Sequence, residues 1–315
     1  MPKPMGHPAA AGIAALALIT MMAAGCGSST GPPGSLDSSF ATGGVVATDY
    51  GLFADFWNVA LQSDGRIVVG GHIKFDFALV RYAPDGKPDA DFGSEGMVTT
   101  DIGGMDDVNA VAIQPDGGIV AVGQITVMAN SPDGADFALA RYTHDGKLDP
   151  SFGSGGIVKV QGFVYPRALA FQSDAKIVTG GPTGPTGGDF AVSRYTPDGE
   201  LDPSFGIVKI PLVLSLHAVA FEPDGKVIIG GSTGESGSDF ALTRYGPDGK
   251  LDASFGTGGT VSTDVGGSDS GMRAIALQPD GRIVVAGLGR SACRGFAGLC
   301  TSGPTELFVA RYFGN

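Results

Sequence analysis

The sequence is poor in the residues from which most catalytic and metal sites are built. It has only 3 cysteines, 4 histidines and 1 tryptophan in 315 residues. It contains no HExxH motif, no paired-cysteine zinc spacing and no GxSxG elbow, so the common zinc-site and serine-hydrolase signatures are excluded. A DxDxDG-like calcium loop is also missing. We therefore expect no metal, no cofactor and no catalytic residue.

Basic side chains and long helical patterns are scarce as well. The chain has 20 Lys and Arg against 32 Asp and Glu, which gives a formal net charge of −12. An acidic surface repels phosphate backbones, so nucleic acid and electrostatic docking on anionic lipid are excluded as partners. No long amphipathic helical window occurs, whereas glycine (53 residues) and short β-branched runs are abundant. This composition predicts an all-β protein.

The N-terminus carries an export signal. Ala9–Ala24 is an apolar run of small residues, too short to span a bilayer comfortably. It leads into Ala23-Ala24-Gly25-Cys26, which resembles the lipobox of bacterial lipoproteins, although Ala23 stands where Leu is usual. The resemblance implies that residues 1–25 are a signal peptide and that Cys26 is diacylated. A soluble secreted protein with an incidental Cys26 is the alternative.

Residues 26–35 follow as a Gly/Ser/Pro-rich flexible tether without core-forming residues. Membrane contact is thus expected through the lipid anchor only. By the rule familiar from envelope lipoproteins, Gly27 rather than Asp after the cysteine favours the outer membrane, with a periplasmic or surface-facing domain.

One block of eighteen residues recurs through the rest of the chain. Its form at 239–256 is DFALTRYGPDGKLDASFG. A fifth copy is split between the chain's two ends, and fixed-period similarity of this kind indicates a repeat architecture. The other copies lie at 76–93, 136–153 and 189–206, with the split copy at 306–312 and 36–40.

Each repeat contains four short apolar segments, which read as strands. The second and third are joined by SDG, PDG or SDA, a tight hairpin turn in which glycine takes positive φ. Ala175 replaces that glycine once, so we expect strain there. The β-branched segment that we place outermost in each sheet lies at 43–49, 96–101, 156–160, 207–210 and 259–264.

Five copies of four strands predict a five-bladed β-propeller over residues 36–315, with an open β-solenoid as the alternative. The last copy ends without its outermost strand. Residues 43–49 fill that vacancy if they pair with 308–312, which closes the ring. An open solenoid would leave both strands as unpaired edges, an aggregation hazard. The ring therefore fits the split copy better.

The repeats resemble the delta-60 repeat family of bacterial tandem-repeat proteins. The resemblance rests on blocks such as ALQPDGRIVVAG, DFALARY and DGKLDPSFG and covers essentially residues 36–312. It implies a propeller-like fold on an exported bacterial protein, with no established activity.

Two further features are expected to be structural. In each SFG block an Asp lies three positions before a Phe. We expect these Asp residues to accept backbone N–H groups in a tight turn or to pair with the recurrent Arg, while Phe fills the base of the blade. The Asp and Phe pairs are Asp37/Phe40, Asp89/Phe92, Asp149/Phe152, Asp202/Phe205 and Asp252/Phe255, and the recurrent arginines are Arg81, Arg141, Arg194, Arg244 and Arg311.

Two cysteines remain after Cys26. Cys293 and Cys300 lie seven residues apart in one inserted loop. In an oxidising compartment such a pair predicts a disulfide, and a metal or redox pair would favour CxxC spacing.

The copies differ mainly in the connections between their third and fourth segments. Insertions confined to one face usually mark the binding face of a repeat protein. One position at the same rim also varies, and these residues are the candidate ligand rim, with neutral drift as the alternative. They are Trp57, Asn109, Arg167, His217 and Arg273.

The sequence thus predicts a monomeric, lipid-anchored module that binds a protein or glycan partner without catalysis. A propeller hydrolase or lyase acting on an extracellular glycan or lactone is the rival hypothesis. A purely structural envelope lipoprotein is the third.

Overall fold

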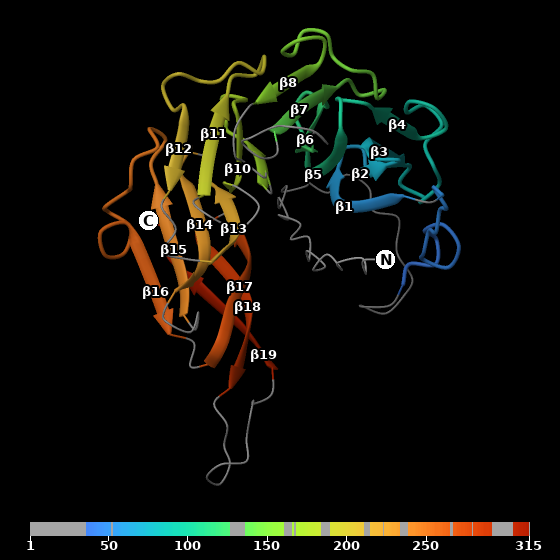
Figure 1. Ribbon diagram of the computed structural model, residues 1–315. Helices are drawn as coiled ribbons and strands as arrows, with labels where there is room; N and C mark the ends of the chain where they lie inside the picture. Colours follow the sequence, from blue (N-terminus) through green and yellow to red (C-terminus); the bar gives the residue numbers. More distant parts are fainter. Residues whose placement is uncertain are drawn as a thin grey trace, which may run out of the picture.

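The computed structural model describes residues 36–51, 53–126, 136–160, 166, 168–183, 190–210, 215–222, 224–233, 239–264, 267–278, 280–291 and 305–314. Over these residues the chain is all β, and five antiparallel sheets follow one another along an arc in chain order (Figure 1). The same residues include no helix with the length and hydropathy to cross a membrane. The expected signal peptide 1–25, tether 26–35 and Cys293–Cys300 loop lie outside them.

The sheets have one plan, with strands in sequence order. Sheet 1 contains β1 (Ala54–Leu61), β2 (Ile67–Ile73), β3 (Asp76–Tyr82) and β4 (Met97–Thr100). Sheet 2 contains β5 (Met105–Ile113), β6 (Ile119–Thr126), β7 (Asp136–Tyr142) and β8 (Ile157–Val160), and sheet 3 contains β9 (Ala168–Phe171), β10 (Ile177–Pro182), β11 (Phe190–Tyr195) and β12 (Ile207–Ile210). Sheet 4 contains β13 (Ser215–Phe221), β14 (Val227–Thr233), β15 (Asp239–Tyr245) and β16 (Thr260–Asp264), and sheet 5 contains β17 (Gly267–Leu277), β18 (Ile283–Ser291) and β19 (Thr305–Tyr312).

The hairpin turns between the first and second strands of each sheet are as predicted. The turn glycines have positive φ, for example Gly65 at 85° and Gly225 at 90°. Ala175 is held at φ 62°, a left-handed conformation that crowds its Cβ. The expected strain at this one turn is therefore present.

The expected strand at 43–49 is not a regular strand in this structure. It has a single bridge, between Thr42 and Val45, and sheet 5 has three strands. The segment contacts sheet 1 instead, where the Tyr82 hydroxyl donates to Thr48 Oγ1 over 3.1 Å. What the described residues show is five sheets of three or four strands, without the closing strand.

The core lies between neighbouring sheets. Four buried clusters fill the four successive interfaces, and the first joins Phe77 and Leu79 of sheet 1 to Val108 and Ile119 of sheet 2. The second strands of sheets 2 and 3 are buried on both faces because each of these sheets has a neighbouring sheet on both sides. Full burial of each such side chain contributes about 1.5–3 kcal/mol.

An arginine latch joins each sheet to the next. The Nε of the recurrent Arg donates to the Asp eight residues later over 2.8–2.9 Å, and its guanidinium stacks on the SFG phenylalanine at 4.6–4.9 Å. Its Nη1 donates to a backbone carbonyl beyond its own sheet. The latch arginines and these acceptors are Arg81 with His144, Arg141 with Pro197, Arg194 with Pro247 and Arg244 with Gly314.

The latch carboxylates are held in their charged form. Asp202 accepts from the Ser204 hydroxyl (2.7 Å) and amide (2.9 Å). The Ser204 hydroxyl is the largest influence on the pKa of Asp202 and, with Lys176 and Arg194, holds it well below its usual range although burial opposes this. Both predicted roles of the repeated Asp, turn cap and Arg partner, are therefore confirmed in sheets 1–4.

Candidate functional site

The rim residues share an unusual backbone position. In sheet 1, Phe56 pairs with Gly71 and Asn58 with Gly70, so Trp57 between them is left out of the register. The same shift occurs in β5, β13 and β17. A β-bulge of this kind bends the strand and redirects the extra side chain. The bulged residues are Trp57, Asn109, His217 and Arg273, and the fifth rim residue, Arg167, lies outside the described residues.

The bulge explains the glycine that ends each second-strand run. A Cβ at Gly71 would lie 1.9 Å from the Asp55 carbonyl oxygen, and one at Gly123 would lie 1.9 Å from that of Asp107. Only glycine fits where the bulged strand approaches so closely. This glycine was the available sequence signal for the bulge, and our sequence analysis did not use it.

Around Trp57 the structure assembles a continuous surface that we call the rim cluster: Phe53, Trp57, His72, Phe75 and Asp107. The rings of Phe53 and Phe75 lie 5.4 Å apart, and His72 stacks on Phe75 at 5.8 Å. Phe53 is 63% exposed, and Trp57 and Phe75 are each 39% exposed. Exposed aromatics in contact with one another are typical of a binding surface.

A half-buried carboxyl, Asp107, lies beside these rings, and its Oδ1 is buried. Asp107 Oδ1 is 3.3 Å from His72 Nδ1, yet neither atom has a hydrogen-bond partner among the described residues. Burial raises the pKa of Asp107, while His72 and Trp57 oppose that rise. The rim cluster thus contains an acid that could accept or donate one further hydrogen bond.

Backbone strain is concentrated at the same place. Phe53, Lys74 and Phe75 have φ of 64°, 52° and 71°, although none of them is glycine. Residues held in this region cost of order 1–3 kcal/mol each and persist where surrounding contacts impose them. The strain presents Phe53 and Phe75 outward at the ends of β1 and β2.

The rim residues that sequence analysis grouped together differ in what their side chains do. Asn109 Oδ1 accepts the Gln124 amide over 3.1 Å, and Asn58 Nδ2 donates to the Asn109 carbonyl. Asn109 therefore secures the bulge, whereas Trp57 is exposed. The side chains of His217 and Arg273 lie outside the described residues. Phe53, His72, Phe75 and Asp107 were not predicted as site residues.

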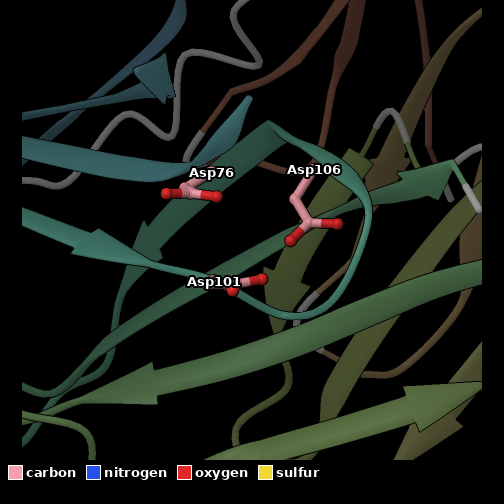
Figure 2. Close-up of side chains that lie close together, drawn as sticks. All are labelled: Asp76, Asp101 and Asp106. Atoms are coloured by element: carbon pink, nitrogen blue, oxygen red, sulfur yellow. The ribbon is translucent and has the colours of Figure 1, made fainter. Parts of the chain in front are cut away.

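An acidic cluster adjoins the rim cluster. Asp76, Asp101 and Asp106 bring carboxylate oxygens within 4.8 Å of one another (Figure 2). Asp76 begins β3, Asp101 follows β4 and Asp106 lies in β5. These three are the residues that could hold a metal ion within the described part of the chain. Sequence analysis missed them because they come from three separate segments.

A hollow of about 420 Å³ opens between sheets 3 and 4. Its walls include Asp174, Lys176, Arg194 and Asp224. Arg194 is a latch residue, and Lys176 pairs with the latch carboxylate of Asp202. The hollow therefore belongs to the scaffold.

Four segments of the chain, 62–92, 114–152, 172–205 and 222–255, match a family model described as a domain of unknown function (DUF5122) beta-propeller. Each segment runs from the end of a first strand to the SFG phenylalanine. The match supports a propeller-like repeat family. Among curated proteins, none matches this sequence.

Solved structures with a similar arrangement have low sequence identity. A protein from Lactobacillus plantarum is 15% identical over 84% of this chain and 73% of its own, with a TM-score of 0.48. A gluconolactonase from Xanthomonas campestris is 14% identical over 82% and 72%, with a TM-score of 0.44. A xylan β-1,4-xylosidase from Bacillus halodurans is 12% identical over 80% and 51%, with a TM-score of 0.40.

Proposed function

We propose that this propeller-like repeat protein is a lipid-anchored envelope module that binds a protein or glycan partner through the rim cluster, without catalysis. The observation that carries the proposal is the bulge. It recurs at one position of four inner strands, and each copy places a different residue there. A scaffold that repeats its backbone and varies the side chain at one site has the organisation of a binding surface.

The chemistry of the rim cluster supports the same function. Trp is among the residues most enriched in binding hot spots, and Trp57 is 39% exposed in a rim cluster that includes two further exposed rings. The latch side, by contrast, repeats the same Arg, Asp and Phe in sheets 1–4. Arg167 and Arg273, which sequence analysis places at the rim, favour an anionic or carbonyl-rich partner.

Trp57 provides a direct test because it is the only tryptophan in the chain. Soluble peptidoglycan fragments, envelope polysaccharide and an acidic peptide should be titrated against the protein while its fluorescence is recorded. We expect one of them to change the emission. Calorimetry with that ligand should show about tenfold or greater loss of affinity for Trp57→Ala, as for a hot-spot residue.

The matched control is Leu251→Ala, which removes a 47% exposed apolar side chain from the latch side. It should leave affinity unchanged, and both variants should melt with the parent. Full affinity in Trp57→Ala would refute the proposed site. Turnover of a glycan or lactone that disappears in Asp107→Asn would support the hydrolase or lyase instead, with the half-buried carboxyl of Asp107 as its acid.

The proposal extends to segments outside the described residues. Residues 1–25 are removed as a signal peptide, Cys26 is acylated, residues 26–35 form a flexible tether, and Cys293 and Cys300 form a disulfide. The proposal also includes a closed five-bladed ring, for which the N-terminal segment gives the support. The Ala41 amide donates to the Asp85 carbonyl over 2.7 Å, as the Gly93 amide does to Asp145 over 3.1 Å. Phe40 packs against Gly86 as Phe92 packs against Gly146.

Thr48 repeats a third contact of this kind. Tyr82 donates to Thr48 as Tyr142 donates to Thr100 and Tyr312 to Thr263, which are contacts between a sheet and the outer strand before it. These contacts support the proposal that residues 36–50 take the place of an outer strand preceding sheet 1. By the order of the repeat, the latch arginine that belongs with Asp37 and Phe40 is Arg311 of β19.

Ring closure predicts that Arg311 and Asp37 act as one unit. We expect Arg311→Ala and Asp37→Ala each to lower the melting temperature, and the double variant to fall no further, because either change removes the same contact. Arg244→Ala combined with Asp37→Ala, which affects two separate latches, is the control and should be additive. Additive losses for Arg311 and Asp37 would instead support the open solenoid.

A further inference from the structure

We propose that Asp76, Asp101 and Asp106 form a calcium site at the junction of sheets 1 and 2. Their carboxylate oxygens lie within 4.8 Å of one another and turn toward a shared space (Figure 2). Calcium binds oxygen at about 2.3–2.6 Å, so two oxygens on opposite sides of the ion lie about 4.6–5.2 Å apart. The spacing of the three carboxylates suits one such ion.

Asp106 indicates that the cluster is more than a group of surface acids. Its side chain is 1% exposed, and its Oδ2 accepts the Ile102 amide over 2.7 Å. Its Oδ1 is buried and has no hydrogen-bond partner among the described residues. A buried, unpartnered carboxylate oxygen is costly unless a cation or a proton supplies what it lacks.

No basic side chain within the described residues neutralises the three acids by an ion pair. Lys159 is engaged elsewhere, since its Nζ donates to the Ile102 carbonyl, and Lys74 is exposed and acts on Asp76 only through its charge. Burial is the main cause that raises the pKa of Asp106, and the charges of Asp101 and Asp76 add to it. A divalent cation would remove this repulsion.

The oxygen ligands and the partial exposure of the site both favour calcium over magnesium. All three groups are carboxylates, and calcium takes six to eight oxygen ligands in flexible geometry, often with water among them. Asp101 is exposed and Asp76 is half-buried, so water can complete the coordination shell. Magnesium requires a near-octahedral arrangement at shorter distances, which residues from three separate segments satisfy less easily.

Two of the three acids have counterparts in another sheet. Asp239 lies opposite Asp264 in sheet 4, in the arrangement of Asp76 and Asp101. The third acid, Asp106, lies eight residues before Gln114 in β5. In β17 the register shifts between Ser268 and Gly271, so this part of the strand differs from β5. The repeat therefore supplies a pair of acids, and in sheet 2 Asp106 completes the group of three.

The calcium ion would also fix the rim cluster, a consequence that rests on the proposed function. Asp76 directly follows Phe75, and Asp106 directly precedes Asp107. The Asp106 amide already donates to the Phe75 carbonyl over 2.6 Å. Calcium at the three carboxylates would hold the β2–β3 turn and the start of β5 in one arrangement, and with them both sides of the surface next to Trp57.

The test is calcium binding by the full chain after chelator treatment, measured by calorimetry with calcium chloride and, in parallel, magnesium chloride. We expect one calcium site with Kd of about 10⁻⁴–10⁻³ M, the range of extracellular modules, and weaker magnesium binding. Asp106→Asn should reduce calcium affinity at least tenfold. Asp85→Asn, at an exposed turn away from the three carboxylates, should leave it unchanged.

Asp101→Asn is a second variant for the case in which Asp106→Asn does not fold. Asp101 is exposed, so its replacement should leave the melting temperature of the calcium-free protein unchanged. It should still reduce calcium affinity. Absence of calcium binding, or full affinity in either variant, would overturn the site and leave a proton shared among the acids as the explanation. No partner is present in this experiment, so its failure leaves the proposed function standing. Full affinity for the partner in Trp57→Ala would refute the proposed function while leaving the calcium site standing.

Discussion

Asp89→Ala should lower the free energy of unfolding by about 3–5 kcal/mol, the usual cost of removing one partner from a buried ion pair. Asp89 holds the latch arginine Arg81, whose side chain is 1% exposed, and also pairs with Arg66 at 2.7 Å. Without Asp89 the Arg81 guanidinium retains its hydrogen bond to the His144 carbonyl and its contact with the Phe92 ring. Its positive charge, however, is then buried without a counter-ion. Urea denaturation at neutral pH measures the loss.

Asp85→Ala is the control for this experiment. Asp85 is also an aspartate of the repeated block, and it pairs with Lys87 over 2.8 Å, but both side chains are exposed. Exposed pairs of this kind contribute little, so the urea midpoint should not move. If Asp89→Ala lowered the free energy of unfolding as little as Asp85→Ala, the latch would not stabilise the packing between the sheets.

Cys26→Ser should transfer the protein from the membrane to the soluble fraction. Two acyl chains on one residue are enough for stable anchoring, whereas a single chain binds reversibly. The chain is acidic overall and would be repelled by anionic lipid, so the acyl chains are the membrane contact that we propose. Fractionation of cells that express the variant, followed by immunoblotting, measures the change.

The double variant Cys293→Ser/Cys300→Ser is the matched control, because it removes cysteines that are not expected to carry lipid. It should remain in the membrane fraction. Cys26→Ser protein that stays there as well would contradict the anchor and favour a secreted protein held by its partner.

The repeat made most of the fold predictable. Gly-containing turns and β-branched runs defined the strand order, and Ala175 was identified as strained because the other copies place glycine there. The Asp, Arg and Phe of the latch were predictable as scaffold for the same reason. A single sequence with five internal copies already contains the comparison that reveals which residues the backbone requires.

The candidate site was harder to predict because it depends on residues that occur once. Trp57 was found by its position, but Asp107 and His72 meet across sheets 1 and 2, and no spacing in the sequence brings them together. Asp106 joins Asp76 and Asp101 only through the loop from β4 to β5. Residues 43–49 carry a strand pattern, yet they form only a bridge between Thr42 and Val45, because a local pattern does not by itself supply the backbone partner that a strand needs.

The latch also determines the order in which the molecule can assemble. Its four contacts between sheets span 63, 56, 53 and 70 residues, so each becomes available as soon as the following hairpin has been made. Because closing a loop of this length costs only slightly more than closing a shorter one, successive sheets can add like repeats of a solenoid from the N-terminus onward. A nascent chain therefore exposes one unfinished latch at a time, and the pairing of Arg311 with Asp37 that we propose would have to wait for the last strand.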